Sequence, residues 1–163
     1  MFEFNDIHVL KNSNNIMIKA DVSMRRFTGQ FSKAQFDLDS AVMTGMIPYM
    51  PMVTSTFIDE TKAMSAAIAG TGYVYAAAPP YGRFLYEGKT MVGESSGSTW
   101  AKLDEKKVLV SQYGGKTAAS EELTYNKSAH PKVTDHWFDA AKAKHGKSWA
   151  RLVKKTAGGG KRG

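Results

Sequence analysis

The segment Ala76–Gly93 constrains the fold more than any other part of this chain, because it interrupts regular structure several times. Pro79 and Pro80 both lack a backbone N–H, so they end any strand or helix that reaches them. Pro80 suits the first turn of a short helix that runs through Tyr86, and Gly88 suits its end. The segment therefore predicts a break, a single helical turn or two, and a second break.

The same segment places three aromatic rings around one guanidinium. Tyr81, Phe84 and Tyr86 lie within three residues of Arg83. A guanidinium among rings can bind an anion or stack at an interface, and a structural ion pair or cation–π contact is equally compatible with the pattern. We interpret these residues as a shaped contact surface, because no nucleophile, acid or base accompanies them.

Length and composition indicate one domain, residues 1–163, that relies on neighbours. The chain has no cysteine, which excludes disulfides, thiolate zinc sites and cysteine nucleophiles. Its apolar fraction of 42% is slightly low for an independent globular domain, so we expect neighbouring chains to complete parts of its core. No apolar run reaches the roughly 18 residues of a membrane span.

Two helices are predicted from the spacing of apolar residues. The first runs from Ser32 to Met46, with Ser32 as N-cap and Pro48 as the stop signal. The second runs from Thr134 to about Ala157, with Thr134 as N-cap. Both are amphipathic, so each is expected to bury one face.

Strands are predicted where apolar and polar residues alternate. Ile16–Val22 alternates cleanly, and Asp6–Leu10 could be its partner. Gly72–Ala77 is a further predicted strand, Lys107–Gln112 a possible one, and Thr61–Ala69 fits either strand or helix. The fold class is therefore α+β: a small mixed or antiparallel β-sheet packed against a long helix in the N-terminal half and a C-terminal helix, with extended loops.

No arrangement of side chains indicates catalysis or metal binding. The four histidines are His8, His130, His136 and His145. His136 and His145 would fall on opposite sides of a helix, and no carboxylate completes a ligand set. The glycine-rich stretches 70–72 and 158–161 lack the spacing of a phosphate-binding loop. We therefore expect no enzyme activity, cofactor, metal or small-molecule substrate.

The positive charge is concentrated at the C-terminal end. Of 22 Lys and Arg and 15 Asp and Glu, residues 124–163 hold ten basic and two acidic ones, which leaves twelve and thirteen for residues 1–123. This asymmetry indicates an acidic partner, either nucleic acid or a protein surface, while a solvated helix with a soluble tail (about 156–163) is the alternative. The candidate contacts with DNA or an acidic partner are Lys154, Lys155, Lys161 and Arg162.

Three segments, in this order, match sequence motifs of one known protein family. The first matches a P-Y-x-P-M-x-T-G segment after a long helix, through Pro48, Tyr49, Pro51, Met52 and Thr54. The second matches a P-Y-A-R and a Y-x-G-K step, through Pro80, Tyr81, Arg83, Tyr86, Gly88 and Lys89. The third matches an H-P segment that leads into W-F-x-x-A-K, through His130, Pro131, Trp137, Phe138, Ala141 and Lys142. The chain departs from the pattern at Val53, Ser55 and Gly82. With these matches the chain resembles the minor capsid proteins of tailed bacteriophages, a family of neck, head–tail connector and tail-completion proteins.

The resemblance spans about residues 31–151 and implies a small α+β subunit of a ring at the head–tail joint. Such rings commonly contain about six or twelve copies, held by heterologous contacts that close on themselves. The implied partners are copies of the chain itself, neighbouring connector, stopper, tail-terminator or tail-tube proteins, and the DNA in the channel; the implied location is the virion, after assembly in the bacterial cytoplasm. The candidate subunit-interface residues are Tyr49, Pro51, Tyr81, Arg83, Phe84, Tyr86, Lys89 and Trp137.

Two other functions remain open at this point. A nucleic-acid-binding module would use the basic last forty residues, and its affinity would fall steeply with salt. An enzyme with an unfamiliar site is the third hypothesis, which the lack of an acid, base and nucleophile set disfavours.

Overall fold

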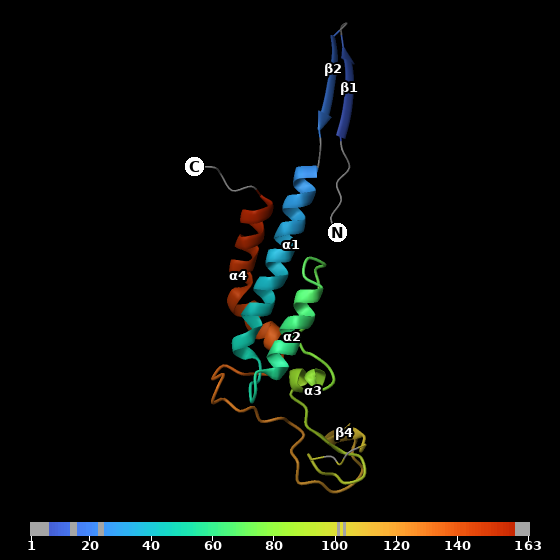
Figure 1. Cartoon of the computed structure of the whole chain (residues 1–163), viewed down its shortest axis with the longest axis vertical. Coiled ribbons are helices and arrows are strands. Elements are labelled where there is room, and N and C mark those ends of the chain that lie inside the picture. The colour runs from blue at the N-terminus through green and yellow to red at the C-terminus, as the bar shows by residue number, and fades with distance from the viewer. Residues whose placement is uncertain (1–6, 14–15, 23–24, 101, 103, 159–163) are drawn as a thin grey trace.

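The computed structural model describes residues 7–13, 16–22, 25–100, 102 and 104–158 (Figure 1). The fold is α+β, as the sequence predicts. The elements, in chain order, are β1 (Ile7–Ser13), β2 (Ile16–Val22), α1 (Arg25–Met46), the 3-10 turn η1 (Ile47–Tyr49), α2 (Thr56–Ala67), α3 (Gly82–Glu87), β3 (Met91–Gly93), β4 (Lys107–Leu109), the 3-10 turn η2 (Val110–Gln112) and α4 (Trp137–Ala157).

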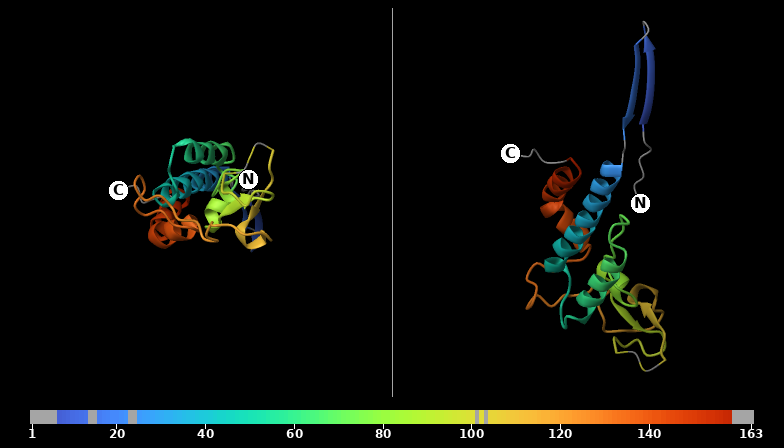
Figure 2. Two further views of the ribbon diagram at one scale, coloured as in Figure 1. Left: turned by 90° about the horizontal axis from the view of Figure 1, so that it is seen from below. Right: turned by 45° about the horizontal axis from the view of Figure 1, so that its top comes forward.

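The two long helices, α1 and α4, lie side by side and antiparallel, and α2 packs along another side of α1 (Figures 1 and 2). The predicted start of α1 at Ser32 is wrong, because the helix begins at Arg25 and runs through Gly29. One exposed glycine inside a helix costs only about 1 kcal/mol, which a long packed helix tolerates. The predicted end is confirmed, since α1 stops at Met46 and Pro48 lies in η1.

The start of α4 differs from its prediction as well. His136, in the left-handed conformation with φ 42°, is the N-cap, and the helix begins at Trp137. Thr134 does not cap it: its hydroxyl donates to Asp135 Oδ1 at 3.0 Å, and its backbone N–H reaches the Tyr49 carbonyl. Long-range contacts of residues 130–136 therefore set the start of this helix. No described helix is long and apolar enough to cross a lipid bilayer.

The core lies where these helices meet. Its buried members are Met43, Met46, Met50, Ile58, Trp137, Ala141 and Trp149. Gly45 lets α4 approach α1 closely, because a Cβ at this position would lie 2.8 Å from Cζ2 of Trp149. Helix packing of this kind, with small residues beneath a large ring, explains why the two helices stay in contact along their length.

The strands form two separate antiparallel sheets of two strands each. β2 matches the predicted strand, and its partner β1 pairs from Ile7↔Val22 to Ser13↔Ile16. This hairpin projects beyond the start of α1, away from the helices (Figures 1 and 2). β3 and β4 pair near the opposite end of the molecule, from Met91↔Leu109 to Gly93↔Lys107.

The predicted strand Gly72–Ala77 is wrong, because side chains of α2 take up its backbone hydrogen bonds. The Ser65 hydroxyl accepts from the Tyr75 N–H at 3.1 Å and donates to the Tyr75 carbonyl at 3.2 Å. The Thr61 hydroxyl accepts from the Ala78 N–H at 3.0 Å. An extended segment with these partners runs along a helix without a neighbouring strand, and the ambiguous 61–69 stretch is mostly helical within α2.

Candidate functional site

The three segments that carry the family resemblance meet in one place, which we call the motif junction (residues 48–52, 80–89 and 130–138). The Tyr49 carbonyl accepts a hydrogen bond from the Thr134 N–H at 3.2 Å. The Met50 carbonyl accepts one from Nδ1 of His130 at 2.8 Å. These two bonds join the first segment to the third across 80 and 85 residues of chain. A carbonyl only accepts, so Nδ1 of this histidine carries the proton.

The second segment joins the same junction through Tyr86 and Trp137. The backbone carbonyl of Tyr86 accepts a hydrogen bond from the His136 N–H at 2.8 Å. The phenol ring of Tyr86 meets the Trp137 ring edge-on, with the ring centroids 4.9 Å apart. Phe57 of α2 approaches the same indole at 6.0 Å, and the indole Nε1–H donates to the Ala76 carbonyl at 2.7 Å. Edge-to-face pairs with a satisfied N–H are a stable way to bury tryptophan.

Two interface candidates therefore belong largely to the interior. Trp137 has 0% exposed surface, so its side chain offers nothing to another subunit, and its interface assignment is corrected here. Tyr86 is half-buried. Burial raises the pKa of its hydroxyl, and the carboxylates of Asp139 and Asp135 raise the pKa further. Both residues shape the junction from within.

The outer side of α3 carries the exposed part of the predicted surface. Tyr81 is 63% exposed. Arg83 is exposed, and its Nε lies 3.1 Å from Oε1 of Glu87, so the guanidinium makes the ion pair considered from the sequence. Phe84 is half-buried in an open groove of about 630 Å³ between α3 and the β3–β4 connection. The groove is also lined by Pro80, Tyr81, Met91, Lys102, Asp104, Glu105 and Lys107.

Glycines allow the close turns around α3. Gly88 ends the helix with φ 66°, as predicted, and the Lys89 N–H reaches back to the Phe84 carbonyl at 3.0 Å. At Gly82 a Cβ would lie 2.6 Å from the Cβ of Ala77. This glycine replaces the alanine usual in the family pattern, and here it lets α3 begin directly against the preceding segment.

The β3–β4 connection is held by the carboxylate of Glu105. Oε1 accepts from the Ser95 and Ser96 N–H groups at 3.1 and 2.8 Å, and Oε2 accepts from the Lys102 N–H at 2.9 Å and the Ser96 hydroxyl at 3.0 Å. These bonds, with those from Lys102 and Ser96 the largest, lower the pKa of Glu105 to about 2. These bonds tie Ser95, Ser96 and Lys102 to Glu105 in the segment that carries Trp100, which is 88% exposed.

The chain returns from this loop along α3. The Tyr125 hydroxyl donates to the Leu85 carbonyl, and burial, followed by the charge of Asp135, raises its pKa to about 12. Lys89 is exposed and forms an isolated antiparallel bridge with Glu122. The remaining interface candidates, Tyr49 and Pro51, are half-buried at the motif junction.

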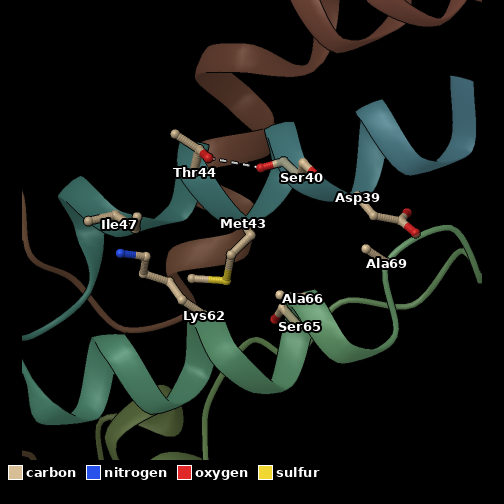
Figure 3. Close-up of a pocket in the computed structure, with 9 residues that line it drawn as sticks. All are labelled: Asp39, Ser40, Met43, Thr44, Ile47, Lys62, Ser65, Ala66 and Ala69. Atoms are coloured by element: carbon tan, nitrogen blue, oxygen red, sulfur yellow. Dashed lines mark hydrogen bonds between the residues drawn. The ribbon is translucent and has the colours of Figure 1, made fainter. Parts of the chain in front are cut away.

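A second groove, of about 210 Å³, lies between α1 and α2 (Figure 3). Met43 and Ile47 of α1 face Ala66 and the Lys62 stem of α2, and Asp39 lies at one end. Asp39 is 4% exposed, and both oxygens of its carboxylate accept hydrogen bonds within the chain. The Lys62 ammonium forms an ion pair with Asp59, so the groove is mainly an apolar seam between the two helices.

Asp39 explains the glycine-rich stretch 70–72. Its Oδ2 accepts from the Gly70 and Gly72 N–H groups at 2.7 and 3.1 Å, and its Oδ1 accepts from Nε2 of Gln35 at 2.7 Å. Both glycines have positive φ, of 92° and 87°, and their N–H groups, on either side of Thr71, point to the same carboxylate oxygen. The turn binds an anion, as phosphate loops do, but the anion is a side chain of its own protein.

The basic residues of the C-terminal region lie along α4. Lys154 and Lys155 are exposed in its last turn, while Lys161 and Arg162 lie outside the described residues. Lys144, Lys147 and Arg151 are exposed on the same helix, although the sequence analysis did not select them. A helical projection of 137–157 would have found them, since they repeat every three or four residues.

Within the described part of the chain, no group of three or more His, Asp or Glu side chains is arranged to hold a metal ion. What the geometry offers is a set of contact surfaces: the outer side of α3, the tip of the β3–β4 loop, and α4. No protein-family model, curated protein sequence or solved structure matches this chain.

Proposed function

We propose that this chain is a structural protein of a tailed bacteriophage. In this proposal it forms a ring with copies of itself at the neck, around the DNA channel, and joins the capsid to the tail through connector, stopper, tail-terminator or tail-tube proteins. It assembles in the host cytoplasm and stays in the virion, and it makes or breaks no bond.

The observation that carries the proposal is that the three segments of the phage resemblance, which lie far apart in the sequence, meet at the motif junction. Each subunit of a ring must also present a contact surface to each of its two neighbours.

The kind of surface exposed also favours assembly. The exposed large hydrophobic residues are Phe27, Phe36, Val53, Tyr73, Tyr75, Tyr81 and Trp100. Phe27 lies in the first turn of α1, whereas Trp100 lies in the β3–β4 connection, beyond the opposite end of the helices (Figure 1). Tyr and Trp are enriched in protein interfaces, and apolar side chains near both ends of the helices suit contacts with different partners on each side.

The motif junction supports the link to the phage family. Three short segments that match in sequence are also joined by hydrogen bonds and ring contacts, through residues such as Tyr49, Tyr86 and Trp137. Independent chance matches would have no reason to converge on one buried tryptophan. The matched residues therefore behave as one structural unit, as expected for a shared subunit architecture.

The test is deletion of the gene from the phage or prophage that carries it, followed by electron microscopy of the particles. We expect filled heads and separate tails, and restoration of joined particles by the gene supplied in trans. Native mass spectrometry of the purified protein should give a closed oligomer. Normal joined particles without the gene, or a protein that stays monomeric and is absent from virions, would refute the proposal.

The exposed aromatics provide a sharper test. The double variant Tyr81→Ser, Trp100→Ser should fold but weaken assembly or joining, because both side chains are largely exposed in the single chain. The matched control is Ser111→Ala, Ser120→Ala, which changes exposed residues without removing apolar surface. Equal assembly of the two variants would show that these aromatics are not interface residues.

A further inference from the structure

One face of α4 carries a row of positive charges. Its members, which we call the basic face, are Lys144, Lys147, Arg151, Lys154 and Lys155, and all five are exposed. At 100° and 1.5 Å per residue, they fall within a sector of about 100° and a length of about 17 Å. The buried residues Ala141 and Trp149 lie on another side of the same helix, toward α1.

No carboxylate among the described residues forms an ion pair with the basic face. Asp139, in the first turn, is the single acid of α4. Asp37 of α1 accepts a hydrogen bond from the Thr156 hydroxyl at 3.3 Å, and it forms no ion pair with the described lysines of α4. The charges on this face are therefore available to a partner from outside the chain.

The like charges also oppose one another. Arg151 has Lys147 one turn before it and Lys154 and Lys155 one turn after it. Each like-charged pair at this spacing destabilises a helix by about 0.2–0.5 kcal/mol, and the C-terminal dipole compensates only in the last turn. A polyanion bound along the face would remove this repulsion.

The composition of the face identifies the kind of polyanion. Lysine is depleted in the core of protein–protein interfaces, and this face has no aromatic residue to anchor one. It also has no Asn or Gln to read base edges, and the Ser148 hydroxyl donates to the His145 carbonyl within the helix. The four lysine ammonium groups act as point charges and the Arg151 guanidinium is a planar fork, and both kinds of group fit phosphate oxygens. Contacts to phosphates position a protein on DNA and carry no sequence information.

We infer that the basic face of α4 binds the phosphate backbone of duplex DNA without sequence preference. The inference rests on the proposed function for its partner, the DNA that passes through the ring. Of the four basic residues selected from the sequence, only Lys154 and Lys155 belong to this face, and Lys144, Lys147 and Arg151 extend it toward the middle of the helix.

The experiment measures binding of the full chain to a fluorescent duplex of random sequence by anisotropy, across a salt series. The test variant is Lys144→Gln, Lys147→Gln, Arg151→Gln. The control, Lys116→Gln, Lys127→Gln, Lys132→Gln, removes the same charge from exposed residues outside α4. Circular dichroism checks that both variants retain the helices.

Five phosphate contacts predict a slope of about −4.5 for log K against log salt, so wild-type affinity rises about 500-fold between about 200 and 50 mM. The test variant should have a slope less steep by about 2.7 and a rise of about 12-fold. The control should follow the wild type. Equal losses in both variants, or wild-type binding by the test variant, would overturn the inference.

Two outcomes separate this inference from the proposed function. If the wild type forms rings but binds no duplex, and the test variant loses its ring, the face contacts an acidic protein surface and the DNA inference is wrong. If the wild type binds duplex through α4 but virions never contain it, the face binds DNA as inferred and the neck assignment fails.

Discussion

Replacing Asp39 tests whether one buried carboxylate joins α1 to the turn that follows α2. In Asp39→Ala, the Gly70 N–H, the Gly72 N–H and the Gln35 amide all lose their acceptor. The bond from the half-buried Gly70 N–H to the carboxylate contributes about 2 kcal/mol. The bonds from the exposed Gly72 and from the Gln35 side chain, which can reach other partners, contribute about 0.5–1 kcal/mol each.

Helix propensity acts in the opposite direction. Alanine in the interior of α1 gains about 0.6 kcal/mol over aspartate, so the net loss in Asp39→Ala is about 3 kcal/mol. For a chain of this size this lowers Tm by about 6–12 °C. Asp39→Asn keeps an oxygen toward the two glycines, but its NH2 then faces Gln35, whose side-chain amide must flip to present its own oxygen. Because the three bonds can be kept and the charge is lost, we expect a loss of about 1 kcal/mol.

The assay is urea unfolding at one fixed protein concentration, because oligomerisation changes apparent stability. Fluorescence of the buried Trp137 and Trp149 and far-UV circular dichroism should give the same midpoint for a two-state transition. Glu60→Ala, an exposed acid on α2, is the control and should stay within about 0.5 kcal/mol. If Asp39→Ala is as stable as this control, the carboxylate does not hold the turn and the reasoning is wrong.

Three further predictions concern the loop and the helix contact. Glu105 has a pKa lowered to about 2 from 4.5, so its contribution to loop stability is complete above about pH 4.5 and is lost as the pH falls through about 2. In NMR spectra, the amide resonance of Ser96 should shift with pH with a midpoint at about 2, and this shift should be absent in Glu105→Gln. A midpoint near 4.5 would contradict the hydrogen bonds described for the Glu105 carboxylate. Gly45→Ala should destabilise the protein by about 1–3 kcal/mol in urea unfolding, because the new Cβ meets Trp149 at 2.8 Å. Gly29→Ala, where nothing lies within 4 Å, should instead stabilise α1 by about 0.5–1 kcal/mol, and a loss at this position would refute the difference in packing.

The candidate site was only partly predictable. The sequence identified the aromatic and proline segment around α3, and Tyr81 and Arg83 are exposed there. It gave Trp137 the same role, although this residue is in the core, because apolar side chains at helical spacing do not reveal whether a neighbour covers them. The net charge of residues 124–163 does not identify Lys144, Lys147 and Arg151 as one face with Lys154 and Lys155, because a sum of charges does not record on which side of a helix each one lies.

Local sequence by itself determined β2, the end of α1 two residues before Pro48, the end of α3 before its C-cap Gly88, and most of α4. Each follows from periodicity or from the backbone limits of proline and glycine, which act within a few residues. Tertiary structure alone decided two other features. Residues 72–77 form no strand, because hydroxyl groups of α2 hydrogen-bond to the backbone of this part of the chain. The glycine turn at 70–72 binds the carboxylate of Asp39, which lies 31 residues before Gly70. In each case the partner of a backbone N–H is a side chain that is distant in the sequence and close in the folded chain. A local sequence pattern holds no information about which distant side chain will lie within hydrogen-bond reach.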